Sequence, residues 1–533
     1  MYDLLIKNGT VVDGTGAPRF QADVAVKDGK IARIAPEIAE EAETVIDARG
    51  LVVAPGFIDT HTHSDGTVFS PETTGYNHLE DGATTELAGQ CGSMAAPYYG
   101  EFDPSHGISK EEYERICEGY TSYFAYVDSI PHGANLAFFA GQGPIRGKVM
   151  GFGDGTPGEE QLEQMRGLMR EAMECGCLGF STGLVYTPSV FAGTHELVEI
   201  AKVAHEYGGV YTTHIRGEGN QLKESIEEAL VIGRESGIPV NISHIKVIGR
   251  QNEGNSRDII RYIEDNQKAG MTITADQYPF TGGSAPLISQ IPPKYLTAGK
   301  AEGLRCLAES AELRKQAEWS IFHEAHEFES NIYSAGYEGC LIAGAYKTKE
   351  HIGKTLAQLA EEQGKTPFDA CIDLLAANDG IVQGIYFSQN DSDLLNFMSQ
   401  PWVMCGSDWS DYGAVVDREK KYGSHPRAMG TMARRLELIR DNGLWTLEDA
   451  IYRLTGMPSE VYGLPMIGKL KEGLNADITV FDYKNVRANA DYDHPFRKNN
   501  GIEYVIVNGK TAVKNGEFTG VKNGKVLRMK RER

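Results

Sequence analysis

Residues 51–63 read LVVAPGFIDTHTH, an apolar and β-branched run that ends in two histidines, His61 and His63, with one residue between them. Side chains alternate between the two faces of a strand, so both imidazoles leave this strand on the same side. Similar runs recur along the chain as TTELAGQC (84–91), NLAFFAGQ (135–142), LGFSTGL (178–184), VYTTH (210–214), VNISH (240–244), MTITAD (271–276) and VMCGSD (403–408). The sequence therefore offers eight candidate strands.

Amphipathic helical stretches separate several of these runs. LVEIAKVAHEYGG (197–209) and SIEEALVIGRESGIP (225–239) are examples, and each stops at Gly or Gly-x-Pro. Strands that alternate with helices indicate a parallel β/α architecture, and eight strands are the number that closes a (β/α)8 barrel. We therefore predict the α/β class, with a TIM-like barrel over 58–462.

Both ends of the chain have a different texture, with short β-rich runs separated by Asn-Gly, Asp-Gly and Arg-Gly pairs. We read the first segment as a small antiparallel sheet, and Asn508-Gly509 and Asn515-Gly516 as hairpin turns. Neither end has enough strands to bury a face alone. The prediction is one small β-sandwich domain made from 1–57 and 463–533.

More than 120 residues separate the seventh and eighth candidate strands, from Asp276 to Val403. Such a gap exceeds an ordinary crossover, so it should hold inserted helices that cover the mouth of the barrel. We expect this lid insertion at about 285–345.

Composition limits the classes of function. The 533 residues carry 52 basic and 74 acidic side chains, a net charge of −22, which disfavours nucleic acid and anionic membranes as partners. The chain has neither a long apolar span nor a signal-peptide pattern, which indicates a cytoplasmic protein whose 8 cysteines are thiols. A small-molecule substrate is expected, and a homo-oligomer is left open.

Five metal-competent groups end strands of the predicted barrel: His61, His63, His214, His244 and Asp408. Taken singly, His214 and His244 are each as well explained as polar residues at a strand end, whereas the His61/His63 pair is already a signal for metal. Taken together, they would meet at the C-terminal mouth, where barrel active sites are built. Imidazole nitrogens favour Zn²⁺ as the ion.

Cys91 ends the second candidate strand and would face the same mouth. By itself it would be read as a small buried hydrophobe, whereas beside a divalent cation it would ionise and bind metal. Asp408 ends the last strand, where it could cap the next helix or serve as a general base. Its position opposite the histidines favours the base.

Further polar groups follow the strands. Lys246 shares strand parity with His244 and should point into the same cavity, which favours an anionic substrate. Tyr278 and Ser284 stand beyond the seventh strand.

The sequence resembles the amidohydrolase superfamily and, within it, the N-acyl-D-amino-acid deacylase (D-aminoacylase) family. The segments that carry this resemblance are GFIDTHTHSD, NHLEDGATTELAGQCG, GFSTGLVYTP, YTTHIRGEG, ISHIK, TADQYPFTGGS, GSD, SHPRAMGT and GLNADITVFD. The cysteine after strand two, with no lysine on strand four, distinguishes the deacylases within the superfamily. Gln142 departs from the pattern, because the family usually has a histidine there.

The resemblance implies roles for individual residues. It implies that Cys91, His214 and His244 hold a tight zinc, and that His61 and His63 form a weaker second site sharing Cys91. It also implies Asp408 as the general acid/base and Tyr186 near the scissile carbonyl. Lys246, Tyr278 and Ser284 match positions that hold the substrate carboxylate.

The expected activity is zinc-dependent hydrolysis of the amide bond of N-acyl-D-amino acids, giving a carboxylate and a free D-amino acid. The preference for D over L rests on the resemblance alone. Two alternatives stand beside it: a cyclic amide hydrolase of the hydantoinase or dihydropyrimidinase type, and a non-catalytic assembly protein that keeps the fold without its metals.

Overall fold

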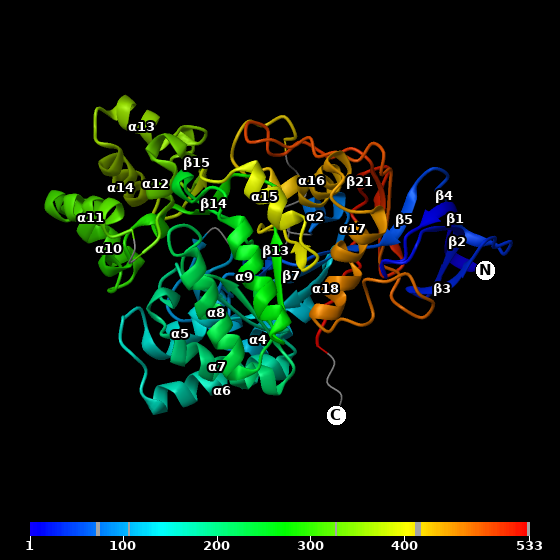
Figure 1. Cartoon of the computed structure of the whole chain (residues 1–533), viewed down its shortest axis with the longest axis horizontal. Coiled ribbons are helices and arrows are strands. Elements are labelled where there is room, and N and C mark those ends of the chain that lie inside the picture. The colour runs from blue at the N-terminus through cyan, green and yellow to red at the C-terminus, as the bar shows by residue number, and fades with distance from the viewer. Residues whose placement is uncertain (71–74, 105–106, 326–327, 411–416, 530–533) are drawn as a thin grey trace.

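A barrel of parallel strands forms the centre of the molecule. The computed structural model describes residues 1–70, 75–104, 107–325, 328–410 and 417–529 (Figure 1). The barrel strands are β6 (Phe57–Asp59), β7 (Ala83–Ala88), β8 (Asn135–Phe138) with its continuation β9 (Ala140–Gly141), β10 (Gly179–Gly183), β11 (Val210–His214), β12 (Val240–Ile242), β13 (Ile273–Gln277) and β17 (Val403–Cys405). The eight runs chosen from the sequence are these strands, and the predicted α/β barrel is confirmed.

Hydrogen bonds close the barrel in register. Parallel pairing runs from β6 through β7 to β8, and from β9 through β10, β11, β12 and β13 to β17. The amide of Thr60, just after β6, donates to the carbonyl of Cys405 in β17 over 3.2 Å. The last strand therefore returns beside the first, and all strands end at one mouth.

Helices cover the outside of the barrel. They are α1 (Ser64–Thr67), α2 (Tyr76–Glu80), α3 (Lys110–Ile116), α4 (Tyr120–Ser129), α5 (Gln142–Met150), α6 (Glu159–Cys175), α7 (Thr194–Glu206), α8 (Leu222–Ser236), α9 (Ser256–Lys268), α15 (Asp391–Met398), α16 (Arg427–Asn442), α17 (Leu447–Leu454) and α18 (Gly456–Val461). The α8 sequence shows why: Leu222, Ile226 and Leu230 form one buried stripe, and Gly237 ends the helix in a left-handed conformation. Among the described residues, no helix combines the length and the apolarity that crossing a bilayer requires.

Both ends of the chain build one mixed sheet, at the right of Figure 1. Its strands are β1 (Tyr2–Val11), β2 (Phe20–Lys27), β3 (Lys30–Ala35), β4 (Ala42–Asp47), β5 (Val52–Pro55), β18 (Ile478–Phe481), β19 (Ile502–Val507), β20 (Lys510–Lys514) and β21 (Glu517–Phe518). The antiparallel reading of the first segment was wrong in part, because β1 pairs parallel with β4 and β5. We keep 1–57, 58–462 and 463–533 as proposed domain limits.

The Asn-Gly pairs differ in their outcome. Asn508-Gly509 and Asn515-Gly516 are hairpin turns with positive φ at both residues, as expected. Asn8-Gly9 instead lies inside β1 as a bulge. A side chain at position 9 would lie 2.4 Å from Val53 Cγ2, so glycine serves close strand packing there rather than a turn.

A separate unit is inserted between β13 and β17, at the end of the molecule opposite the terminal sheet (Figure 1). It contains β14 (Gly283–Pro286), α10 (Lys300–Glu309), α11 (Ala311–His323), α12 (Asn331–Ala335), β15 (Cys340–Ala345), α13 (Leu356–Gln363), α14 (Pro367–Ala377) and β16 (Val382–Tyr386). The three strands pair in the order β14-β16-β15 around their own apolar core. The unit therefore extends past the expected 285–345, because β16, the central strand of its sheet, comes last of the three in the sequence.

Candidate metal centre and active site

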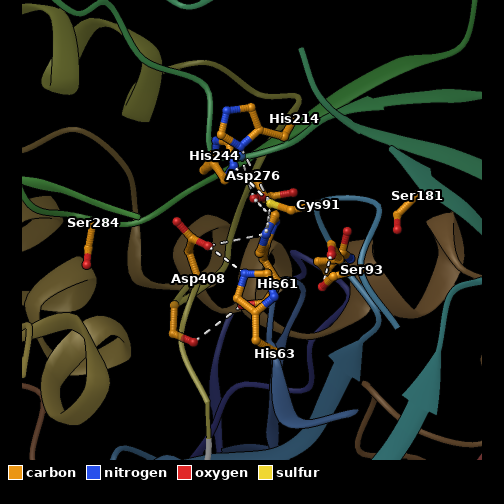
Figure 2. A network of polar contacts seen from close by, with 12 residues as sticks. His61, His63, Cys91, Ser93, Ser181, His214, His244, Asp276, Ser284 and Asp408 are labelled. Carbon is orange, nitrogen blue, oxygen red and sulfur yellow. Dashed lines mark hydrogen bonds and ion pairs between the residues drawn. The ribbon is translucent and has the colours of Figure 1, made fainter. Parts of the chain in front are cut away.

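Polar side chains from five barrel strands meet at the C-terminal mouth (Figure 2). His61 and His63 follow β6, and Cys91 follows β7. His214 is the last residue of β11, His244 follows β12, and Asp408 follows β17. The barrel thus gathers residues from 61 to 408 in one place.

The thiol of Cys91 lies at the centre of this cluster. Its Sγ is 3.3 Å from His61 Nε2, 3.3 Å from His244 Nε2 and 3.7 Å from His214 Nδ1. The Cys91 residue is buried, and the three imidazoles that surround its sulfur leave it no ordinary hydrophobic packing role.

Asp408 closes the cluster on the other side. Its Oδ1 lies 3.0 Å from His63 Nε2 and 3.5 Å from His61 Nε2, and its Oδ2 accepts an ion-paired contact from Arg427 Nη1 at 2.8 Å. The alternative of a helix cap does not apply to α16, which begins at Arg427 with Pro426 at its N-cap.

The backbone is strained at the mouth. Cys91, His244 and Asp408 have φ values of 53°, 36° and 53°, in the left-handed region that residues with a Cβ rarely adopt. Each such conformation costs about 1 kcal/mol or more and persists where the surrounding structure imposes it. The three residues share one site, which is typical of side chains aimed for function.

Buried carboxylates orient the imidazoles from behind. Asp276 Oδ1 lies 3.1 Å from His61 Nδ1 and accepts the His244 backbone N–H at 2.8 Å. Glu218 Oε1 lies 3.0 Å from His244 Nδ1. Such partners hold the Nδ1 side of each ring, so that Nε2 faces Cys91.

Charges across the cluster shift its protonation equilibria. Burial alone would raise the pKa of the Cys91 thiol, but the adjacent His61 and His244 rings outweigh it and hold that pKa well below its usual value. Burial would likewise raise the pKa of Asp408, and the Arg427 guanidinium holds it well below the ordinary range. Both groups are therefore anionic at neutral pH.

The donor set fits a divalent metal. One ligand atom each of His61, Cys91, His244 and Asp408 lies within 4.8 Å of the others, and His214, Glu218 and His244 form a second such group. All of these residues are buried. A thiolate among imidazoles with a carboxylate beside it is the mixture of soft and borderline donors that suits zinc.

A cavity of about 440 Å³ opens next to the cluster. His63, Cys91 and Asp408 line it together with Tyr186 and Ser284. The Tyr186 ring lies 5.1 Å from the His214 ring. Ser284, labelled in Figure 2, donates through its Oγ to the Gly384 carbonyl at 2.8 Å, so the inserted unit fixes its position.

Lys246 and Tyr278 were expected to face the cavity and hold the substrate carboxylate. In the described structure neither residue lines this cavity. Lys246 Nζ lies 2.5 Å from Glu218 Oε1 and 2.7 Å from His244 Nδ1. The Tyr278 hydroxyl accepts from Gln389 Nε2 at 3.1 Å, and its ring packs under Arg427, 4.7 Å from the guanidinium carbon to the ring centroid. Gln142, at the departure from the family pattern, donates to Glu196 and not to the metal-competent cluster.

Sequence reasoning missed three residues of the site. Arg427 lies in the quoted SHPRAMGT segment, and its charge was the available signal. Asp276 ends a recognised strand as a buried carboxylate. Glu218 follows His214 by four residues, but no strand or helix pattern links the two.

The chain has relatives among known proteins. The model of the amidohydrolase family matches residues 44–328 and 350–513. The chain is similar to D-aminoacylase of Alcaligenes xylosoxydans xylosoxydans, at 32% identity over 99% of this chain and 97% of that protein. It is 30% identical to N-acyl-D-glutamate deacylase of the same organism, over 95% of this chain and 93% of the relative.

One solved structure shares the fold of this chain. The structure of N-acyl-D-glutamate deacylase from Bordetella bronchiseptica, complexed with zinc and a phosphonate inhibitor that mimics the tetrahedral intermediate, superimposes with a TM-score of 0.80. It shares 30% sequence identity, and the match covers 99% of each chain.

Proposed function

Because this chain belongs to the amidohydrolase family, we propose that it is a zinc-dependent hydrolase that cleaves the amide bond of N-acyl-D-amino acids to a carboxylate and a free D-amino acid. The observation that carries this proposal is the thiol of Cys91 within 3.7 Å of three histidine rings at the mouth of the barrel. The substrate is a small molecule that reaches the metal centre through the adjacent cavity.

Cys91, His214 and His244 would hold the tight zinc, and His61 and His63 would provide a weaker second site that shares Cys91. When bound, zinc supplies Lewis acidity to an amide carbonyl and makes water acidic enough to be deprotonated near neutral pH. Asp276 and Glu218 keep His61 and His244 in the tautomers that present Nε2.

Asp408 is the general base and acid of this scheme. Arg427 holds its Oδ2 at 2.8 Å, which leaves Oδ1 directed at the imidazoles and able to take a proton from the attacking water. The same oxygen then delivers that proton to the amide nitrogen as the C–N bond breaks, so the amine leaves neutral. Burial raises the pKa of Tyr186 well above its usual value, so its hydroxyl keeps the proton with which it bonds the acyl carbonyl.

Ser284, Lys246 and Tyr278 are the proposed anchors of the substrate carboxylate. Of these three Ser284 lines the cavity, as does Arg427, which packs on Tyr278. Arg427 is 3% exposed and stacks on both Tyr278 and Trp409. A guanidinium fixed in this way offers a carboxylate a rigid set of N–H donors.

Two features weigh against the alternatives. The cyclic amide hydrolases would use a lysine on the fourth strand, and β10, with the sequence GFSTG, has none. A non-catalytic scaffold would not need strained backbone at Cys91, His244 and Asp408.

We place the protein in the cytoplasm, a proposal supported by eight unpaired cysteines. Its proposed partners are small molecules, and a homo-oligomer is compatible with this scheme.

A substrate screen tests the function. Zinc-loaded full-length protein is assayed on N-acetyl and N-formyl D-amino acids, the matching L-amino acids and a hydantoin. We expect amine release from D-substrates only. Turnover of the hydantoin with no amine release would favour the cyclic amide alternative. A protein that retains no added zinc and turns over none of these compounds would favour the scaffold.

A further inference from the structure

The wall of the cavity divides by chemistry. Near the metal centre it is polar, with His63, Asp408 and Arg427. Away from it, the wall is made by the stretch that follows Ser284 in the inserted unit, ending at Lys300, and by Tyr99 of the barrel. The inserted unit therefore supplies a part of the pocket that the barrel mouth alone lacks.

This part of the wall would face the amino-acid side chain of the substrate. The α-carbon carries both the carboxylate and the side chain, so the side chain must lie within a few bonds of the carboxylate anchor. Ser284, one of the proposed anchors, begins the stretch that contains Ile288, Ile291 and Leu296. The side chain then lies against these residues, while the acyl group extends from the other side of the amide bond.

The wall contributed by the inserted unit is mainly apolar, and its uncharged polar members are Ser284, Ser289 and Gln383. Ile291 and Leu296 are 1% and 3% exposed, and Met94 and Ile288 are also buried. Val185, which follows barrel strand β10, also lines the cavity. An apolar substrate side chain gains by leaving water here, whereas a carboxylate would lose its hydration and gain no hydrogen bond or opposite charge in return.

One cation interrupts this wall, but it is already paired. Among the described residues that line the cavity, the Lys and Arg side chains are those of Lys300 and Arg427. Lys300 Nζ lies 2.6 Å from Glu101 Oε2, and Glu101 is not part of the lining. Lys300 lines the cavity, and both side chains are about one-third exposed, at 31% and 30%, so the pair is not sealed in the core.

The Glu101 carboxylate has two effects on an acidic substrate. It occupies the ammonium that the acidic side chain would need, and its own negative charge repels a second carboxylate at short range. Sequence identity does not decide between the neutral and acidic classes, because the chain is 32% identical to a D-aminoacylase and 30% to an N-acyl-D-glutamate deacylase. The Lys300–Glu101 pair beside the cavity supplies the structural criterion.

We propose, building on the proposed function, that this enzyme selects N-acyl-D-amino acids with uncharged, apolar side chains, and that Glu101 enforces the selection by holding Lys300. Glu101 is a specificity-determining residue that acts through Lys300 and not on the reacting atoms. Its removal should convert Lys300 into a binding site for an acidic side chain.

The test compares kcat/KM for N-acetyl-D-leucine and N-acetyl-D-glutamate with zinc-loaded full-length enzyme. The wild type should favour leucine by about 100-fold or more. Glu101→Gln should raise the glutamate-to-leucine ratio by about tenfold, and adding Lys300→Met should cancel that rise. Glu302→Gln is the matched control: Glu302 pairs with Arg305 on the surface of the same helix as Lys300, and its loss should leave the ratio unchanged.

Zinc content and melting temperature are measured for every variant. If Glu101→Gln does not fold, Lys300→Met alone serves instead, and it should lower the ratio further because Glu101 then stands unopposed. A wild-type preference for glutamate, or equal ratios in Glu101→Gln and Glu302→Gln, would overturn the inference while leaving the proposed function intact. Hydrolysis of neither substrate by zinc-loaded enzyme would overturn both.

Discussion

The ammonium of Lys246 lies 2.5 Å from Glu218 Oε1, so the lysine expected to receive the substrate carboxylate is already ion-paired inside the protein. The same oxygen lies 3.0 Å from His244 Nδ1. One buried carboxylate therefore joins the metal-competent cluster to the proposed substrate anchor, and its loss should affect both.

Glu218→Gln tests the link to the metal. An amide in place of the carboxylate weakens the orientation of His244, so we expect zinc affinity to fall by about 10–100-fold. Competition with a chelator measures this without turnover. Glu329→Gln is the control, because the hydrogen bonds described for Glu329 come from the backbone N–H groups of Glu218 and Gly219 and not from an imidazole; unchanged zinc affinity in Glu218→Gln would remove it from metal support.

Lys246→Met tests the anchor. Loss of one ionic contact with a carboxylate should raise KM for N-acyl amino acids by about 10–100-fold. For the matching primary-amide substrates, which lack the carboxylate, KM should change little. Equal effects on the two series would show that Lys246 supports His244 and does not bind substrate.

Asp408→Asn separates the base from a ligand. The amide cannot take a proton, so we expect kcat to fall by about 10²–10⁴-fold. Zinc content, measured by atomic emission, should stay near that of the wild type. A parallel loss of zinc and activity would mean that Asp408 is mainly a structural ligand.

A buried carboxyl far from the site gives a pH prediction. Burial raises the pKa of Asp477 to about 6, above its unfolded value near 3.9. A raised folded pKa contributes stability that is complete below about pH 4 and is lost as pH rises through about 6, which amounts to roughly 2–3 kcal/mol. Asp477→Asn should therefore lose less stability than the wild type between pH 4.5 and 7.5, measured by thermal unfolding; a constant difference between the two proteins would contradict the shift.

The barrel could be predicted from the sequence because each strand is a short apolar run closed by turn chemistry. Runs such as VYTTH and VNISH carry that pattern locally, and parallel topology places their ends at one mouth. Asn8-Gly9 shows the limit of local reading: the pair resembles a hairpin turn, but packing against Val53 places it within β1.

The site was less accessible to sequence reasoning, because its supporting residues carry no local pattern. Glu218 and Arg427 become visible only when the chain is folded, since their partners, His244 and Asp408, come from other strands. The inserted unit is similar: its central strand β16 pairs with β14, about 100 residues earlier, and no periodicity records that pairing.

X-ray absorption at the zinc edge tests the central claim most directly, because it reports the ligands of the bound ion. Protein loaded with one zinc per chain should show one sulfur scatterer at about 2.3 Å together with imidazole nitrogens at about 2.0–2.1 Å, and Cys91→Ala should remove the sulfur. A zinc spectrum without sulfur in the wild type, or one that keeps its sulfur in Cys91→Ala, would contradict a metal centre built on Cys91.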